Sequence, residues 1–187
     1  MAPRSKSARR VRLPICLALW AILSAQPAPP VRAASQPTEY DVKAAYLLNF
    51  TRFIEWPPNA FADPTAPFAI CILGRDPFGS VLEEIVKGES AGGRRIVIQH
   101  PAQLPAPQTC QIVFVTAGEK DVARVVAGLG PGVLTVGEGA AFVREGGIVA
   151  FVLENRRVRF DISQARAEQA SLKISSRLLN VARLVEK

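Results

Sequence analysis

The sequence is poor in the side chains from which most catalytic and metal sites are built. It contains one histidine, His100, three cysteines, one methionine and two tryptophans in 187 residues. His100 belongs to no HExxH motif and no Cys/His cluster, which argues against a zinc site, and no partner for acid–base work is visible beside it. We therefore expect no metal, no cofactor, and a loop histidine rather than a catalytic one.

Long hydrophobic runs are also lacking. The main apolar run covers residues 13–25, well short of the roughly 20 residues that a transmembrane helix needs. Five cations precede it, and small residues and prolines follow it. This order is typical of a cleaved secretory signal peptide, here residues 1–33, with an uncleaved anchor as the alternative. Cleavage after Ala25 or Ala33 fits the small-residue rule, and Val31 at the −3 position favours Ala33.

An excess of positive charge is confined to this leader. The formal net charge is +7, but residues 1–33 hold six cations and no acids. The other residues hold 17 cations and 16 acids, a net charge of +1. A nearly neutral protein lacks the field that attracts phosphate backbones, so we expect no nucleic-acid partner. Because no second long apolar run exists, we also expect no membrane insertion of the mature chain.

Removal of the leader leaves two cysteines, Cys71 and Cys110. In an oxidising compartment they have one intramolecular pairing, and two separately buried thiols are the alternative. Residues 34–38 have the composition of a disordered lead-in. Residues 39–187 are long enough for one domain with its own hydrophobic core.

The apolar pattern after residue 38 predicts alternating helices and strands. Helices are expected over residues 39–54, 77–86 and 119–129. Short apolar runs predict strands over residues 68–73, 95–99, 112–115, 133–136 and 148–153. Asp76 followed by Pro77 is the expected start of the second helix. The fold class is thus a single-domain α/β protein, with a helix-flanked mixed sheet of about five to six strands.

The C-terminal part is expected to form a hairpin and a long helix. Residues 157–162 alternate between apolar and charged side chains, which predicts the second strand of a hairpin, half exposed and at the sheet edge. Apolar residues at helical spacing predict one long or broken helix over residues 164–186. The stripe consists of Ile174, Leu178, Val181 and Val185.

Few side chains stand out as a binding site. Trp56 follows the first helix, where it can pack on the core or contact a partner. Arg157 and Arg159 lie on the outer face of the hairpin, as a solvated surface or as a docking surface for acidic groups. Together with Lys173 and Arg177 they are the expected partner-binding residues. No nucleophile elbow or phosphate-binding loop is present, so the residues argue against an enzyme.

Short motifs along the mature chain carry a family resemblance. They lie at residues 42–47, 49–50, 53, 55–57, 71–74, 76–79, 92–95, 110–115, 133–136, 146–148, 157–162 and 172–179. In combination and in order they resemble the YfiR family of periplasmic proteins, over essentially the whole mature chain. Two positions depart from the family pattern: Ser163 replaces a frequent asparagine, and Ser171 replaces a glycine.

The resemblance implies a regulatory function without catalytic residues. YfiR-like proteins bind the periplasmic sensory domain of a YfiN-type inner-membrane diguanylate cyclase and repress it, which lowers cyclic di-GMP and biofilm formation. Redox state or an outer-membrane lipoprotein relieves the repression. The resemblance also implies a periplasmic α/β sandwich that is often dimeric, with a disulfide between Cys71 and Cys110. A homodimer is therefore among the expected partners.

A small-ligand sensor is the alternative function. Such a protein would serve another membrane partner, for example a histidine kinase or a transporter. Its pocket would lie between the loops of residues 74–79 and 116–119, which follow two predicted buried strands.

Overall fold

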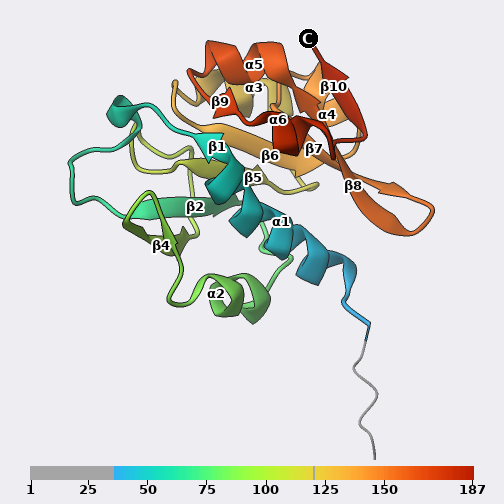
Figure 1. The fold of residues 1–187 in the computed structure, drawn as a ribbon, viewed down its shortest axis with the longest axis horizontal. Coiled ribbons are helices and arrows are strands. Elements are labelled where there is room, and N and C mark those ends of the chain that lie inside the picture. The colour runs from blue at the N-terminus through green and yellow to red at the C-terminus, as the bar shows by residue number, and fades with distance from the viewer. Residues whose placement is uncertain (1–35, 120) are drawn as a thin grey trace, which may run out of the picture. The chain divides into compact units, whose positions relative to one another are not determined.

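An eight-stranded mixed sheet organises the part of the chain that the structure describes. The computed structural model describes residues 36–119 and 121–187. Its strands are β1 (Ile54–Glu55), β2 (Phe68–Leu73), β3 (Ser90–Ala91), β4 (Arg94–Gln99), β5 (Ile112–Val115), β6 (Leu134–Glu138), β7 (Val149–Glu154), β8 (Arg157–Ser163), β9 (Lys173–Ile174) and β10 (Leu184–Glu186). Its helices are α1 (Glu39–Phe53), the 3₁₀ turn η2 (Pro58–Ala60), α2 (Ser80–Val86), α3 (Val122–Gly128), α4 (Ala141–Arg144), α5 (Gln164–Gln169) and α6 (Ser176–Leu179). β1 and β9 form a separate two-stranded sheet (Figure 1).

The main sheet has the strand order β10-β8-β7-β6-β5-β2-β4-β3. Five adjacent strands, β7, β6, β5, β2 and β4, run parallel to one another. β8 is antiparallel to β7, and β3 is antiparallel to β4, so the predicted mixed α/β sheet is confirmed. The chain leaves β2 for β4 on one side and then returns to β5 on the other side. The strand order therefore reverses between β2 and β5.

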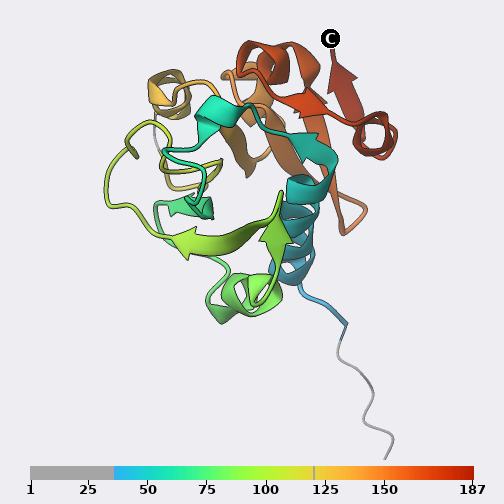
Figure 2. The same ribbon diagram turned by 60° about the vertical axis from the view of Figure 1, so that its left-hand side comes forward.

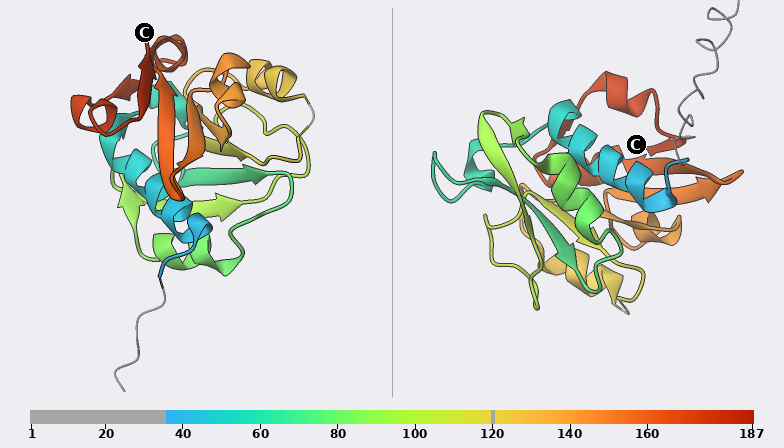
Figure 3. Two further views of the ribbon diagram at one scale, coloured as in Figure 1. Left: turned by 90° about the vertical axis from the view of Figure 1, so that its right-hand side faces the viewer. Right: turned by 90° about the horizontal axis from the view of Figure 1, so that it is seen from below.

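β2 and β5 are buried on both faces, as their apolar sequences predict. Successive side chains of a strand point to opposite faces. Phe68, Ile70 and Ile72 accordingly join the larger core, which α1 and α2 cover. Ala69 and Cys71 join the smaller core, which α3 and α4 cover. Figure 3 shows α1 and α2 on one side of the sheet and α3 on the other.

The first predicted helix is confirmed in α1. Its start is fixed by a capping box, in which the Thr38 hydroxyl accepts from the backbone N–H of Asp41 and the Asp41 carboxylate accepts from the N–H of Thr38. The helix ends where Ile54 becomes extended and pairs with Ile174 of β9. Figure 2 shows β1 beside β9 beyond the end of α1.

Two helices begin later than the sequence predicts. α2 does not start at Pro77, because Asp76 Oδ1 accepts a hydrogen bond from the backbone N–H of Phe78 and holds a turn instead. Gly79, with a φ of 57°, then precedes the first helical residue. α3 likewise begins only behind its N-cap residue, Asp121.

The predicted long C-terminal helix is wrong. Residues 164–186 instead form α5, β9, α6 and β10. α5 ends because Ser171 adopts a φ of 60°, which closes a Schellman motif. In this motif Leu172 N–H donates to Ala167 O, and Ser171 N–H donates to Glu168 O. The two strands that follow, β9 and β10, pair with β1 and β8. No local sequence pattern predicts these pairings.

The predicted strand number and sheet edge are also wrong. The main sheet has eight strands rather than five to six, and β8 lies inside it, because β10 pairs with β8 in parallel. The guanidinium of Arg183 bonds to both carboxylate oxygens of the buried Asp161, with Nε at 2.8 Å from Oδ1. This ion pair anchors the start of β10 on β8.

The predicted hairpin of β7 and β8 is confirmed. The two strands pair antiparallel as far as Glu154 opposite Arg157. Asn155 and Arg156 between them have φ values of 51° and 60°. Two left-handed central residues are typical of the tight turns that match the twist of a hairpin. The tip of this hairpin extends to the right in Figure 1.

Candidate functional site

A crevice opens at the carboxyl ends of β2, β5 and β6. In open α/β sheets, ligands bind where the strand order reverses, because the two loops there leave in opposite directions. A pocket of about 490 Å³ lies at this place. Its lining residues are Tyr40, Gly74, Arg75, Pro77, Thr116, Ala117, Gly118, Glu119 and Glu138. Most of them belong to the loops of residues 74–79 and 116–119, for which the sequence suggests a pocket.

Gly74 allows the ends of β2 and β5 to approach closely. It has a φ of +99°, and a Cβ atom there would lie 2.3 Å from Oγ1 of Thr116. A side chain at residue 74 would therefore be strained in its backbone and would collide with the neighbouring loop. The backbone at Gly74 and the side chain of Thr116 thus lie in close contact at the crevice.

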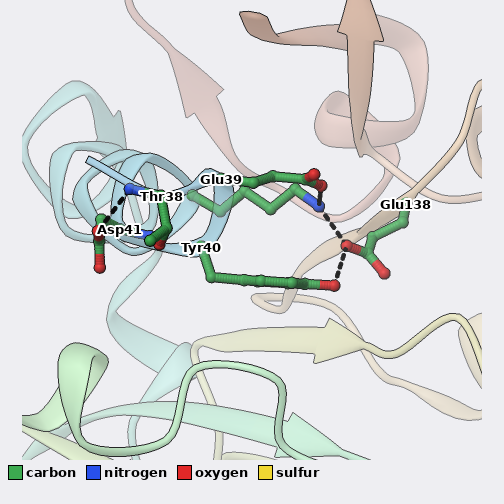
Figure 4. Close-up of polar contacts among 6 residues, drawn as sticks. Thr38, Glu39, Tyr40, Asp41 and Glu138 are labelled. Atoms are coloured by element: carbon green, nitrogen blue, oxygen red, sulfur yellow. Dashed lines mark hydrogen bonds and ion pairs between the residues drawn. The ribbon is translucent and has the colours of Figure 1, made fainter. Parts of the chain in front are cut away.

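A buried lysine joins α1 to the end of β6. Lys43 is only 4% exposed, and its ammonium group bonds to the carboxylates of Glu39 and Glu138. The hydroxyl of Tyr40 donates to Oε1 of Glu138 at 3.2 Å. The Lys43 Nζ also lies 4.5 Å from the centre of the Tyr40 ring. Figure 4 shows Tyr40 reaching across from α1 to Glu138.

The charges of this cluster stabilise one another. Burial alone would lower the pKa of Lys43, but its hydrogen bonds to Glu138 and Glu39 outweigh burial, so the pKa is raised above the ordinary value of 10.5. Burial and the neighbouring Glu138 charge raise the pKa of Tyr40 above 10.0. The raised pKa values of Lys43 and Tyr40 therefore keep the ammonium group charged and the phenol neutral at neutral pH.

Glu138 lines two neighbouring pockets. Besides the crevice, it lines a neighbouring pocket of about 620 Å³ together with Glu39, Lys43, residues 151–154 of β7 and Arg183. Its Oε1 accepts from both Lys43 and Tyr40, whereas Oε2, which is accessible to solvent, has no bond to any residue that the structure describes. In Figure 4 this second oxygen points away from α1.

The sequence did not single out this cluster. Glu39 and Lys43 are four residues apart on a helix, a spacing that favours an ion pair, and this was the one local signal. Glu138 is 95 residues from Lys43 and carries no pattern of its own. Only the fold brings them together.

Cys71 and Cys110 form a disulfide, so the alternative of two separate thiols does not hold. The Cα atoms are 5.9 Å apart, within the range that a disulfide requires. The bridge links the middle of β2 to the residue before Gln111 and β5, on the face that α3 and α4 cover. It therefore ties two neighbouring parallel strands of the central sheet.

Trp56 packs on the core at the end of β1. Its indole N–H donates to the backbone oxygen of Gln111 at 3.1 Å, and its ring meets Phe68 edge to face at 4.8 Å. These contacts match the core-packing alternative. Part of the ring is exposed, and a role in partner binding stays a prediction.

The other predicted partner-binding residues fall into two groups. Arg157 and Arg159 are exposed on β8, in the hairpin. Lys173 is exposed in β9, and Arg177 is exposed on α6, both beyond the end of α1. Lys173 pairs with Glu55 of β1, next to Trp56. The structure thus places Trp56, Lys173 and Arg177 near the two-stranded sheet, and the two arginines on the hairpin.

His100 has a partner that the sequence did not reveal. Its Nε2 lies 3.0 Å from Oδ2 of Asp76, in an exposed pair. Within residues 36–119 and 121–187, no group of three or more His, Cys, Asp or Glu side chains could hold a metal ion. Over the same residues no helix is long and apolar enough to cross a membrane.

Comparisons with known proteins agree with this architecture. The sequence matches the YfiR/HmsC-like family over residues 40–183. No curated protein matches the chain. The crystal structure of a conserved domain protein from Vibrio cholerae O1 biovar El Tor N16961 matches with a TM-score of 0.51 at 10% identity. The match covers 81% of this chain and 62% of that chain, and it supports the fold alone.

Proposed function

Because the chain belongs to the YfiR/HmsC-like family, we propose that it is a periplasmic regulatory protein that represses an inner-membrane diguanylate cyclase by direct contact. The observation that carries the proposal is the family match over residues 40–183, which spans nearly all of the described fold. The signal peptide predicted for residues 1–33 supports export. Binding to the sensory domain of the cyclase would lower cyclic di-GMP and biofilm formation without any reaction on this protein.

Repression by binding requires a difference in affinity. A bound protein shifts a cyclase between active and inactive forms only as far as it prefers the inactive form. A tenfold preference corresponds to about 1.4 kcal/mol, which a few well-placed contacts supply. A small docking surface on this protein is therefore sufficient for a graded response.

The β7–β8 hairpin is the docking surface that we propose. Arg156, Arg157 and Arg159 are exposed on it, and Leu153 is 59% exposed. Exposed basic side chains suit a partner surface with acidic groups, and an exposed apolar side chain adds contact area. Trp56, Lys173 and Arg177 form the second part of the proposed contact.

Charge reversal in the hairpin tests the docking surface. The protein is co-expressed with an inner-membrane diguanylate cyclase that has a periplasmic sensory domain, and cellular cyclic di-GMP is measured. The variant R157E/R159E should bind the cyclase about tenfold more weakly, since each arginine would meet an acidic partner group. Cyclic di-GMP should then rise toward the level of cells without the protein.

The matched control is R124E, which reverses an exposed arginine on α3, a helix that is not part of the hairpin. It should repress like the wild type. If both variants repress equally well, the hairpin is not the docking surface. If the wild type neither binds nor represses the cyclase, the proposed function itself is wrong.

A small-ligand sensor is the second candidate function. The observation that favours it is the crevice at the reversal of strand order, lined by the loops of residues 74–79 and 116–119. Its volume lies within the range of ligand pockets. The two functions are compatible, because a ligand in the crevice can act on a protein that also binds a cyclase.

A further inference from the structure

We propose that the crevice binds a small aliphatic amine, with the Oε2 carboxylate oxygen of Glu138 as the acceptor for its ammonium group. The inference deepens the second candidate function and rests on it. It does not depend on the cyclase, because the ligand site lies within this chain.

The two oxygens of the Glu138 carboxylate differ in their hydrogen bonds. Lys43 is buried beside it, and its ammonium group bonds to Oε1 as a counter-ion. Tyr40 donates to the same oxygen, so two donors converge on one side of the group. Oε2 has no bond within the described part of the chain, and the side chain borders the crevice. The second oxygen of such a carboxylate can accept a hydrogen bond from a donor such as an ammonium group.

The cluster of Tyr40, Lys43 and Glu138 already holds one ammonium group, that of Lys43. The Lys43 Nζ bonds to Glu138 while it lies 4.5 Å from the centre of the Tyr40 ring. Carboxylate oxygens and an aromatic face are the groups that proteins use to hold alkylammonium ions. Glu138 and Tyr40 also line the crevice, so an amine entering it meets the same two kinds of group.

The other residues that line the crevice are partly polar. Thr116 supplies a hydroxyl, and residues 117–118 supply backbone. The lining therefore includes polar groups that can accept hydrogen bonds from a ligand.

The test uses the protein purified from the periplasm and two probes of equal length. Titration calorimetry measures the binding of 1,4-diaminobutane and of 1,4-butanediol, which has hydroxyl groups in place of the amines. The diamine should bind with a Kd of about 1 mM or below, and the diol at least tenfold more weakly. E138Q should weaken diamine binding about tenfold, because the amide keeps the shape but loses the charge.

The control E84Q removes an exposed carboxylate on α2 and should leave diamine binding unchanged. If E138Q does not fold, as circular dichroism would show, T116V decides, since it removes only a hydroxyl of the crevice and should weaken binding several-fold. Equal binding of diamine and diol, absence of diamine binding, or binding unaffected by these variants overturns the inference. Repression of the cyclase is measured separately. A protein that does not repress the cyclase can still bind the diamine, and a protein that does not bind the diamine can still repress the cyclase.

Discussion

At the scale of single residues, Lys43 is a buried cation that requires counter-ions. It places an ammonium group on the inner side of α1, only 4% exposed. Glu39 and Glu138 compensate the charge, and the three groups hold the first turn of α1 on the end of β6. Removing the lysine leaves the side chain of Glu138, itself only 16% exposed, without its counter-ion.

We expect K43M to lower the free energy of unfolding by about 2 kcal/mol. Methionine retains the length and volume of the lysine side chain, so the loss reports the charge interaction. Unfolding in guanidinium chloride measures it. K87M, which removes an exposed lysine at the end of α2, is the control and should change stability by less than about 0.5 kcal/mol.

The same variant should change the pH dependence of stability. The pKa values of Lys43 and Tyr40 are raised in the folded state, so the folded protein holds these protons more tightly than the unfolded chain. Their stabilisation is complete below about pH 10 and is lost as the pH rises through the folded-state pKa values. K43M should lose less stability than the wild type between about pH 9 and about pH 11. Parallel pH curves would contradict this role of Lys43.

At the scale of elements, Ser171 decides the shape of the C-terminal part. A serine with a φ of 60° occupies the position after α5 where helices commonly place glycine. This position is also where the YfiR-family pattern has glycine. The backbone turn is therefore retained with a residue that is less suited to it.

S171G should raise the free energy of unfolding by about 0.5–1 kcal/mol, because glycine adopts the left-handed conformation without steric cost. S171A is the matched control: it removes the hydroxyl but keeps the Cβ, so its stability should stay near that of the wild type. Thermal unfolding followed by circular dichroism compares the three proteins. Equal gains in both variants would show that the hydroxyl, and not the backbone strain, is unfavourable.

Local pattern predicted those elements whose burial is continuous. β2 and β5 are recognisable because every side chain is apolar and both faces are covered. The residues after Ser163 misled the prediction, since Ile174 and Leu178 fit a helical stripe, yet Ile174 pairs with Ile54 in a strand. Local pattern did not predict the candidate site for the same reason, because Lys43 and Glu138 are distant in the sequence and come into contact only in the folded protein.

At the scale of the whole molecule, the disulfide ties the central strands. Cys71 and Cys110 are 39 residues apart in the sequence, and closing such a loop restricts the unfolded chain. The bridge lies in the smaller core, whereas α1 and the Lys43 cluster lie against the larger one. The smaller core has fewer buried side chains and therefore depends more on this link.

The double variant C71S/C110S should unfold with a free energy lower by up to about 4 kcal/mol. Urea unfolding without reductant measures the difference, and reduced wild-type protein is the matched comparison, expected to resemble the variant. We also expect the variant to repress the cyclase less well, because a looser sheet holds the docking surface less firmly. A variant that folds and represses like the wild type would contradict this expectation.

The pairing of β1 with β9 has a consequence for the order in which the protein folds. It joins Ile54 to Ile174, a separation of 120 residues, whereas β10 pairs with β8, which is much nearer in the sequence. Contacts between distant residues form late, because a long loop must close first. We therefore expect β1 to pair with β9 later than β8 pairs with β10. A chain in which residues 173–174 have not yet been synthesised has no partner strand for β1.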